Sequence, residues 1–421
     1  MKKRIFIFIL MIVSVSFLFS GGFSLFEAGS RAVGMGESFV AVADDLSAMF
    51  YNPAGLSYLE GTNVSIGGTL IFPSTEFKGA APYPGEGVNE KAISQTFVIP
   101  NFYIGKKIGK RIYIGTGITV PFGLGVNWDD NWSGRYITTN TEIKAVDFTP
   151  TLALQLSESF SLAISYIYRN AKLFNDQKIP FVNPWTFAVQ DVAALHLETA
   201  YSHGSGFRAG TLIKLGKINF GLSYMSEIIM DFTGDAKFTM ISTGNQTLDY
   251  ILASQFPATA KGKTTLVFPS NLSVGFSTTA FEGLLFSFQL DYMKWSDYKE
   301  LKIEFEDYPK FSTTIEKHYK NTYSFRFGAE KILSKKLAAR VGYFYDQGAP
   351  EPVSLGPDLP DSDKHGITFG LSFTMGKIKV DFGNIVLFFR DRSTENLNED
   401  NFNGTYGSFA FISGINLNFN F

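Results

Sequence analysis

The sequence predicts an all-β fold: a 14-stranded antiparallel transmembrane β-barrel with an N-terminal hatch in its lumen. Three observations lead to this prediction. They are an export signal at the N-terminus, repeated stretches in which apolar and polar residues alternate, and long connections that alternate with short ones. The composition agrees, because the 421 residues include 43 Phe and 40 Gly and only 18% are charged, against about 25% in an average soluble protein.

The overall charge and the absence of cysteine exclude several classes of protein. Lys and Arg total 37, Asp and Glu total 39, and the formal net charge is -2. The chain therefore has no basic field that would attract the phosphate backbone of a nucleic acid. Without cysteine it forms no disulfide, no zinc–thiolate site and no thiol nucleophile. We expect no nucleic-acid partner.

The first residues have the pattern of an export signal. Residues 2–4 are Lys-Lys-Arg, residues 5–19 are apolar except for two serines, and small residues follow. The apolar run is shorter than the roughly 20 residues that a spanning helix needs. We predict a signal peptide at 1–20, with cleavage after Ser20 or, alternatively, after Gly22. No longer apolar run follows, so an exported chain this apolar is either secreted and soluble or a transmembrane barrel.

The last strand separates these two classes. From Phe409 to Phe421 the odd positions are apolar with one exception, whereas the even positions are mostly polar or small. Alternation over about 13 residues is longer than a usual globular strand and fits a tilted membrane strand. The terminal Phe421 resembles the assembly signal of bacterial outer-membrane barrels, which implies the barrel assembly machinery as a partner. A soluble sandwich would leave this long edge unpaired and prone to aggregation.

The same alternation recurs along the chain and gives about fourteen strands, an even number as in bacterial barrels. Connections after odd-numbered strands are mostly long, such as 174–202 and 233–263, and those after even-numbered strands are short. This asymmetry places the long loops outside and the short turns in the periplasm. The predicted strands are 62–72, 94–106, 110–121, 141–156, 160–173, 203–215, 217–232, 264–279, 283–298, 319–333, 336–347, 364–376, 377–390 and 407–421.

Residues 21–60 do not continue the pattern. They lack sustained alternation and are rich in glycine and other turn-forming residues. They are nevertheless too apolar for a disordered leader, and the lumen of about fourteen strands is too wide for side chains alone to fill. We therefore predict that 21–60 fold into the lumen as a hatch and that 61–421 form the barrel. The alternative is a disordered periplasmic tail.

Several short motifs resemble one known family. The segment GGFSLFEAGSRAVGMGESFVAVADDLSAMFYNPAGLSYL, the pair Pro100-Asn101 and the stretches VPFGL at 120–124 and RFGAEKILSKKLAARVGYFYDQGAPEP are similar in order and spacing to the FadL family of outer-membrane transporters for long-chain fatty acids and other hydrophobic compounds. The resemblance implies a monomeric barrel of fourteen strands plugged by a hatch. It also implies ligand capture at the third and fourth outer loops, binding in the lumen, and lateral escape through a gap at a kink in the third strand.

The residues of the third strand agree with such a kink. The candidate kink residues are Pro121, Phe122 and Gly123. Proline cannot donate to the strand ladder and glycine gives up side-chain packing, so pairing should fail there. Unpaired backbone groups are costly in lipid, so the gap must face protein. The resemblance makes the hatch motif the candidate for that contact, and its residues are Asn52, Pro53 and Ala54. The alternative is an ordinary Asn-Pro turn and a strand that ends at Pro121.

Two outer loops have apolar residues suited to capturing a hydrophobic ligand. Residues 178–200 are expected to form a partly helical apolar patch, and 238–256 carry a second apolar group. The proposed capture residues are Phe181, Trp185, Phe187, Leu195, Tyr250 and Ile251. Exposed apolar loops require an explanation, and the alternative is that they pack against each other as a cap.

Alternation also directs several cations toward the lumen, where one of them would pair with the carboxylate of a ligand. The candidates are Arg169, Arg208, Arg326 and Arg340. Pairing with nearby acidic residues of the wall is the competing interpretation for each of them.

No catalytic pattern is present. The sequence contains no HExxH, GxSxG or P-loop motif, so we expect no enzyme activity, no metal and no cofactor. The predicted function is passive uptake of hydrophobic small molecules across the outer membrane, with long-chain fatty acids as the first choice and monoaromatic hydrocarbons as the alternative. A surface-interaction or adhesin-type barrel without transport is the alternative of another class.

Overall fold

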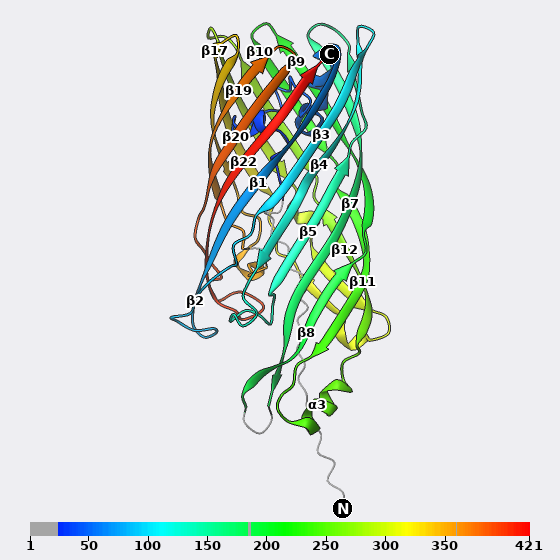
Figure 1. Cartoon of the computed structure of the whole chain (residues 1–421), viewed down its shortest axis with the longest axis vertical. Coiled ribbons are helices and arrows are strands. Elements are labelled where there is room, and N and C mark those ends of the chain that lie inside the picture. The colour runs from blue at the N-terminus through cyan, green and yellow to red at the C-terminus, as the bar shows by residue number, and fades with distance from the viewer. Residues whose placement is uncertain (1–23, 184–186, 359) are drawn as a thin grey trace, which may run out of the picture.

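The first and last strands of the chain pair with each other and close a ring. Their ladder runs from Asn63 opposite Asn420 to Gly79 opposite Gly404. The computed structural model describes residues 24–183, 187–358 and 360–421. The ring has 14 staves, where a stave is one strand or two consecutive strands that together cross the wall once. All pairings are antiparallel (Figure 1), which confirms the predicted all-β class and the number of strands.

Each of the fourteen staves overlaps one of the fourteen predicted segments, and the differences lie mainly in length. The staves are β1 (Thr62–Gly79), β3 (Phe97–Ile108), β4 (Ile112–Asn127), β5 (Asn140–Phe148) with β6 (Thr151–Gln155), β7 (Phe160–Val182), β8 (Val189–Thr199) with β9 (Ser202–Leu215), β10 (Ile218–Met225) with β11 (Ile228–Met240), β12 (Thr259–Phe268) with β13 (Asn271–Thr278), β14 (Leu284–Met293) with β15 (Glu300–Phe305), β16 (Thr313–Glu316) with β17 (Thr322–Ser334), β18 (Leu337–Asp346), β19 (Lys364–Met375), β20 (Ile378–Phe389) and β22 (Gly404–Asn420).

The remaining elements are short. They are the strands β2 (Asn89–Lys91) and β21 (Arg392–Ser393), the α-helices α1 (Ser30–Val33), α2 (Ala48–Tyr51) and α3 (Gln246–Ala253), and the 3-10 helices η1 (Pro53–Tyr58), η2 (Trp295–Asp297), η3 (Pro309–Phe311) and η4 (Pro352–Ser354). Among the described residues, no helix has the length and hydropathy needed to cross a membrane.

Apolar side chains cover the outside of the wall. In β22, Phe409, Ile415 and Leu417 are 41%, 44% and 37% exposed, whereas Asn416 is 4% exposed and faces inward. An apolar outer face with a polar inner face is the pattern of a wall embedded in lipid. The alternation recognised in the sequence therefore has the expected orientation in this strand.

The third outer loop differs from the prediction. Residues 174–202 were expected to be a loop with a partly helical patch, but β7 continues to Val182 and pairs with β8, with Phe174 opposite Glu198 and Val182 opposite Val189. The physical reason is that inward residues such as Ile179 stay buried while outward residues such as Lys178 become polar. Lys178 pairs with Asp130 at 3.1 Å, so the apolar half of the alternation disappears although the strand does not.

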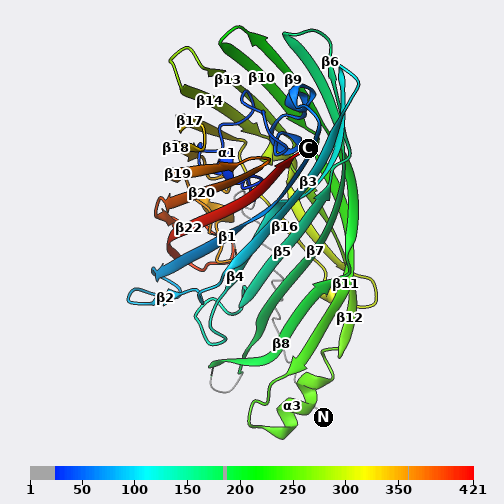
Figure 2. The same ribbon diagram turned by 45° about the horizontal axis from the view of Figure 1, so that its top comes forward.

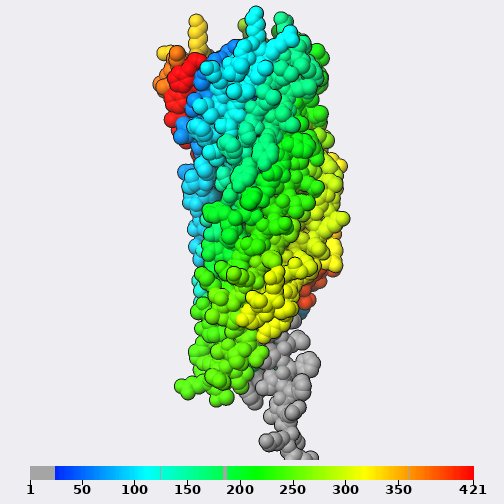
Figure 3. Space-filling view, turned by 90° about the vertical axis from the view of Figure 1, so that its right-hand side faces the viewer, coloured from blue at the N-terminus to red at the C-terminus, as the bar shows by residue number. Residues whose placement is uncertain are grey.

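The wall is tallest on this side. β7, β8, β11 and β12, green in Figure 3, extend further toward the outer end than the blue and cyan strands. The helix α3 caps this extension (Figure 1), and its N-cap is Asn245, whose side chain accepts hydrogen bonds from the backbone N–H groups of Thr247 and Leu248 at 3.1 Å. Part of the predicted loop 233–263 is thus strand and helix.

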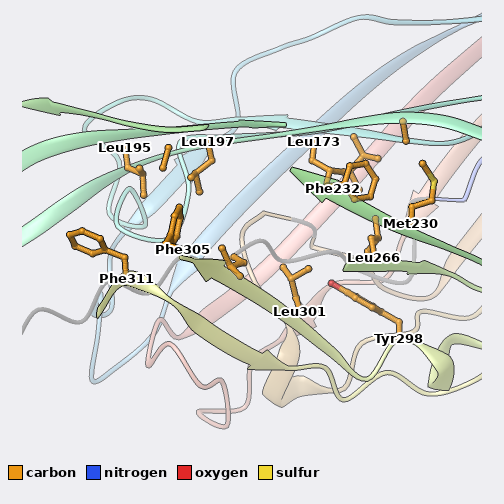
Figure 4. Packing of buried hydrophobic residues seen from close by; sticks show 14 of the residues in the cluster. Leu173, Leu195, Leu197, Met230, Phe232, Leu266, Tyr298, Leu301, Phe305 and Phe311 are labelled. Carbon is orange, nitrogen blue, oxygen red and sulfur yellow. The ribbon is translucent and has the colours of Figure 1, made fainter. Parts of the chain in front are cut away.

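The outer part of the bore is filled by apolar side chains. Leu195 and Leu197 of β8, Phe232 of β11 and Phe305 of β15 belong to one buried cluster, and Figure 4 shows side chains of several strands converging in it. Close packing of this kind leaves little room for water. Any path for a ligand through this region must therefore be apolar.

Residues 24–60 lie inside the ring, near the end that carries the short turns (Figure 2). Most residues from 27 to 57 are buried. Backbone N–H groups of this segment donate to side chains on strands spaced around the ring. The pairs are Ser30 to Asn416 of β22 (2.9 Å), Gly36 to Thr368 of β19 (2.9 Å) and Val40 to Gln289 of β14 (2.8 Å).

Glycine allows this segment to approach the wall closely. Gly36 has a φ of +62, and a Cβ there would lie 2.9 Å from the backbone nitrogen of Tyr343 in β18. A side chain at this position would therefore meet both backbone strain and a steric clash. The segment and the inner wall are fitted to each other at this point.

Candidate functional site

The wall has an unpaired stretch between β3 and β4. These strands pair from Ile108 opposite Ile112 to Phe102 opposite Ile118 and, in the described ladder, no further. Beyond that point residues 97–101 of β3 pair with β1 alone. β4 does not end at Pro121, as one interpretation of the sequence required, but continues along β5 with a shift of register between Thr119 and Phe122.

The start of the described N-terminal segment lies at this stretch. The Leu25 N–H donates to the Pro121 carbonyl at 2.8 Å, and Ser24 forms an isolated antiparallel bridge with Phe122. A Cβ on Gly123 would lie 3.0 Å from a methyl carbon of Leu25. These contacts give the kink residues a partner from inside the barrel, as the cost of unpaired backbone in lipid requires.

The predicted partner of the kink was wrong in its residues. Asn52, Pro53 and Ala54 are buried, but the hydrogen bonds that this motif makes to the wall go to β7 and β9 and not to the kink. The Asn52 amide donates to the backbone carbonyls of Val40 (2.7 Å) and Thr211 in β9 (2.9 Å). The Ala54 carbonyl accepts from the Ser161 hydroxyl of β7 at 3.0 Å. The motif therefore anchors the N-terminal segment to β7 and β9, and the first residues of the segment reach the kink instead.

A cavity of about 520 Å³ lies behind the unpaired stretch. Its size is within the range of ligand sites, roughly 300–1,000 Å³. Most of its surface is apolar, from residues such as Phe26, Phe97, Ile99, Val120 and Phe344. Its charged lining consists of Glu27 and Glu37 of the N-terminal segment, Asp346, Asp361 and Lys364 of the wall and the adjoining loop, and the pair Glu142 and Lys144 of β5.

Three of the four candidate arginines are paired with carboxylates. Arg169 holds Asp147 through two hydrogen bonds of 2.7 and 2.8 Å. The other two belong to larger networks. Arg326 pairs with Asp291 (2.7 Å), Asp346 (3.0 Å) and Glu37, and Arg340 pairs with Glu330 and with Asp381 (3.3 Å). Each charge is buried, and buried charges require partners of this kind.

Arg208 differs from the other three arginines. It is 7% exposed and forms no ion pair within the part of the chain that the structure describes. Its guanidinium donates to the Met225 sulfur at 3.2 Å and lies over the ring of Phe50, 5.1 Å from the centroid. Among the four candidates, Arg208 is the one whose guanidinium is not committed to a carboxylate of the described residues.

The proposed capture residues do not form one surface. Phe181 and Leu195 are 8% and 1% exposed and belong to the buried cluster of Figure 4. Phe187 and Tyr250 are each 80% exposed at the outer end, and Ile251 is half-buried in α3. Trp185 lies outside the described residues. The structure thus separates the five described residues into a group at the outer end and an internal group.

Sequence reasoning missed the charged residues of the N-terminal segment. Arg31 pairs with Glu330 of β17 at 2.9 Å, and Glu330 also holds Arg340, so this network ties the segment to two staves. Glu27 and Glu37 lie at the cavity. The available signal was the presence of charged residues in a segment predicted to be buried, because such charges need partners.

A closed antiparallel barrel with an apolar outer face, an occupied lumen and a cavity at a break in its wall defines a class, the large barrels of bacterial outer membranes. The particular family is identified by sequence. Residues 11–421 match the family described as outer membrane protein transport protein (OMPP1/FadL/TodX), so the chain belongs to this family and is an outer-membrane protein.

Individual relatives are distant but cover nearly the whole chain. A long-chain fatty acid transport protein of Escherichia coli O6:H1 is 26% identical over 390 residues, which are 86% of each chain. Outer membrane protein P1 of Haemophilus influenzae is 24% identical over an alignment of 457 positions, which covers 96% of this chain and 95% of that protein.

Solved structures share the fold. The crystal structure of a Pseudomonas aeruginosa FadL homologue has a TM-score of 0.83 at 19% identity and covers 95% of this chain and 100% of its own. The toluene transporter TodX of Pseudomonas putida has a TM-score of 0.69 at 15% identity and covers 89% of this chain and 94% of its own.

Proposed function

We propose that this protein takes up hydrophobic small molecules passively across the outer membrane, with long-chain fatty acids as the first choice. The observation that carries the proposal is the apolar cavity behind the unpaired stretch of β3 and β4. Unpaired backbone in a lipid-facing wall is costly, so a break that the chain retains at this cost supports a functional role. A ligand that leaves through this break enters the bilayer directly and avoids a water-filled path.

Hydrophobic burial supplies the driving force for capture. Each methylene removed from water contributes about 0.8 kcal/mol, so a long acyl chain gains on the order of 10 kcal/mol in an apolar site. No external energy source is needed for this step. The exposed Phe187 and Tyr250 at the outer end are the proposed first contacts, and the buried apolar cluster below them is the proposed path inward.

Residues 21–60 are the proposed hatch and 61–421 the proposed barrel domain. In this mechanism Ser24 and Leu25 hold the kink closed through Pro121 and Phe122. Release of a ligand requires these contacts to open, because Leu25 and Phe26 line the cavity. Asn52, Pro53 and Ala54 hold the remainder of the hatch against the wall during this movement.

Arg208 is the proposed partner of a fatty-acid carboxylate within the lumen. It lacks the carboxylate partners that occupy Arg169, Arg326 and Arg340. A buried guanidinium forms strong charge-assisted hydrogen bonds with a carboxylate. An incoming fatty acid would therefore supply the counter-ion that the wall does not.

Monoaromatic hydrocarbons are the second candidate ligands. The aromatic side chains Phe26, Phe97 and Phe344 around the cavity favour them, and a relative by fold is described as a toluene transporter. A surface-interaction barrel without transport is the candidate of another class. Catalysis is not part of any of these proposals. The monomeric state and assembly through Phe421 remain predictions.

Uptake measurements test the proposal. Cells that express the protein should take up labelled oleate or toluene faster than cells that carry an empty vector. Lipid particles prepared without detergent should retain a hydrophobic ligand that mass spectrometry identifies. If expression accelerates the uptake of neither compound, the transport function is refuted and the surface-interaction alternative gains support.

A further inference from the structure

The inner end of the cavity carries more acid than base. Four carboxylates of the described lining, Glu27, Glu37, Asp346 and Asp361, interact with the cations Arg326 and Lys364, and Arg326 also holds Asp291. Lys144, which also lines the cavity, pairs with Glu142 at 2.8 Å. Lys364 pairs with Asp361 at 3.1 Å. Arg326 is the cation that interacts with the remaining carboxylates, and the single positive charge of its guanidinium cannot neutralise three or four of them.

Four buried carboxylate oxygens at this end have no hydrogen-bond donor among the described residues: Oε2 of Glu27, Oε1 of Glu37, Oδ1 of Asp346 and Oδ1 of Asp361. The last two face cations in ion pairs, with Arg326 at 3.0 Å and Lys364 at 3.1 Å, so the two glutamate oxygens are the ones left without a partner among the described residues. Glu27 is 9% exposed and Glu37 is 2% exposed, and both residues line the cavity. A buried acceptor without a donor is costly, and a donor brought by a ligand would remove that cost.

The charge of the ligand is constrained by the same residues. Where Glu27 or Glu37 is ionised, a ligand carboxylate placed beside it would add a like charge in a site of low polarity, where repulsion is strong. A hydroxyl group would donate a hydrogen bond without adding charge. The apolar walls near Phe26 and Phe97 would take the hydrocarbon part of either ligand equally, so the polar end decides between them.

We propose that this cavity is a subsite for hydrophobic ligands whose polar end donates a hydrogen bond and carries no negative charge, such as a long-chain alcohol or a fatty acid in its neutral form. This inference rests on the proposed function, because it concerns a ligand on its way out through the wall. It also assigns different polar partners to the two luminal sites: a guanidinium at Arg208, and acceptors at Glu27 and Glu37. A fatty acid therefore passes the wall cavity as the uncharged acid.

Photoaffinity labelling tests the proposal with the full-length protein in lipid nanodiscs. Two photoreactive long-chain probes of equal length are used, one ending in a hydroxyl group and one in a carboxylate. Labels on the residues that line the cavity are located by mass spectrometry at mildly alkaline pH. We expect the alcohol to label these residues at least about tenfold more than the carboxylate, a difference of ~1.4 kcal/mol.

Glu27→Gln is the decisive variant. Glu27 has no ion pair among the described residues, whereas Glu37 also holds Arg326, so replacing Glu27 disturbs the network less. Removal of its charge should lower the preference for the alcohol by at least about threefold. Glu60→Gln, the same change at the exposed end of the segment, is the control and should retain the preference.

Each outcome decides a different point. Equal labelling of the cavity by both probes, or stronger labelling by the carboxylate, overturns the inference and leaves the proposed function standing. A preference that Glu27→Gln does not change also overturns it, because the acceptors would not be its cause. If neither probe labels any residue inside the barrel, the proposed function fails as well.

Discussion

Asn52→Ala should loosen the N-terminal segment inside the barrel. The Asn52 side chain is fully buried and makes three hydrogen bonds to backbone groups. Its amide donates to Val40 (2.7 Å) and Thr211 (2.9 Å), and its Oδ1 accepts from the Ala54 N–H at 3.2 Å. A Cβ on Gly210 would overlap this oxygen, so the side chain fills its site tightly.

The magnitude follows from these contacts. A neutral hydrogen bond contributes about 1 kcal/mol net, and alanine would remove three of them, so we expect a local cost of about 3 kcal/mol. That cost corresponds to roughly a hundredfold rise in the population of the opened segment. The barrel itself should remain folded, because the strand ladders do not depend on Asn52.

Hydrogen exchange followed by mass spectrometry measures this effect directly. Peptides that cover residues 38–58 should exchange about a hundredfold faster in Asn52→Ala than in the wild type, with little change in β1 and β22. Asn245→Ala, which removes the N-cap of α3 at the outer end, is the matched control and should leave peptides 38–58 unchanged. Unaltered exchange of these peptides in Asn52→Ala would refute the assignment of Asn52 as an anchor.

Three further changes test other parts of the account. Gly123→Leu should crowd the kink beside Leu25, obstruct the exit and slow ligand uptake while circular dichroism shows an intact barrel; undiminished uptake would argue against exit at the kink. Arg169→Met should destabilise the barrel by about 3–5 kcal/mol in chemical denaturation because it leaves Asp147 buried and unpaired, and Asp147→Asn in the same protein should recover much of the loss. Burial lowers the pKa of Lys317, in the loop before β17, from 10.5 to about 8. Because the unfolded chain then binds more protons between these values, stability should rise with pH across that window, and Lys317→Met should raise the melting temperature below pH 8 but not above the window; a flat difference across pH would contradict this explanation.

The wall could be predicted from the sequence because lipid imposes a simple pattern. Residues such as Phe409 and Ile415 alternate with polar ones wherever the outer face meets lipid, and the C-terminal strand was placed to within a few residues. The same rule failed at the outer hairpin, where the outward residues Asp176 and Lys178 are polar and pair with His196 and Asp130. Alternation of hydrophobicity reports the surroundings of a strand, and pairing of the backbone can continue after those surroundings change.

The site was less predictable, because contacts between distant residues decide it. The kink residues could be named from proline and glycine chemistry, but their partners Ser24 and Leu25 carry no local signal. The alternation of residues predicted that Arg169 and Arg208 point toward the lumen. Only the fold shows that Arg169 pairs with Asp147, whereas Arg208 has no ion pair among the described residues. Pairing of buried charges is a property of the ring's register and cannot be derived from spacing along the chain.

The most direct test of the account is a reversible lock between the N-terminal segment and the kink. Ser24 and Phe122 face each other in an antiparallel bridge, a spacing that suits a disulfide. Because the chain contains no cysteine, the double variant Ser24→Cys and Phe122→Cys can form a single intramolecular disulfide, the one between these two positions. Uptake of labelled oleate by cells carrying this variant is measured in the oxidised form and again after reduction. We expect oxidation to stop the uptake of oleate and reduction to restore it. Full uptake by protein whose disulfide is verified by mass spectrometry would contradict lateral release through the kink.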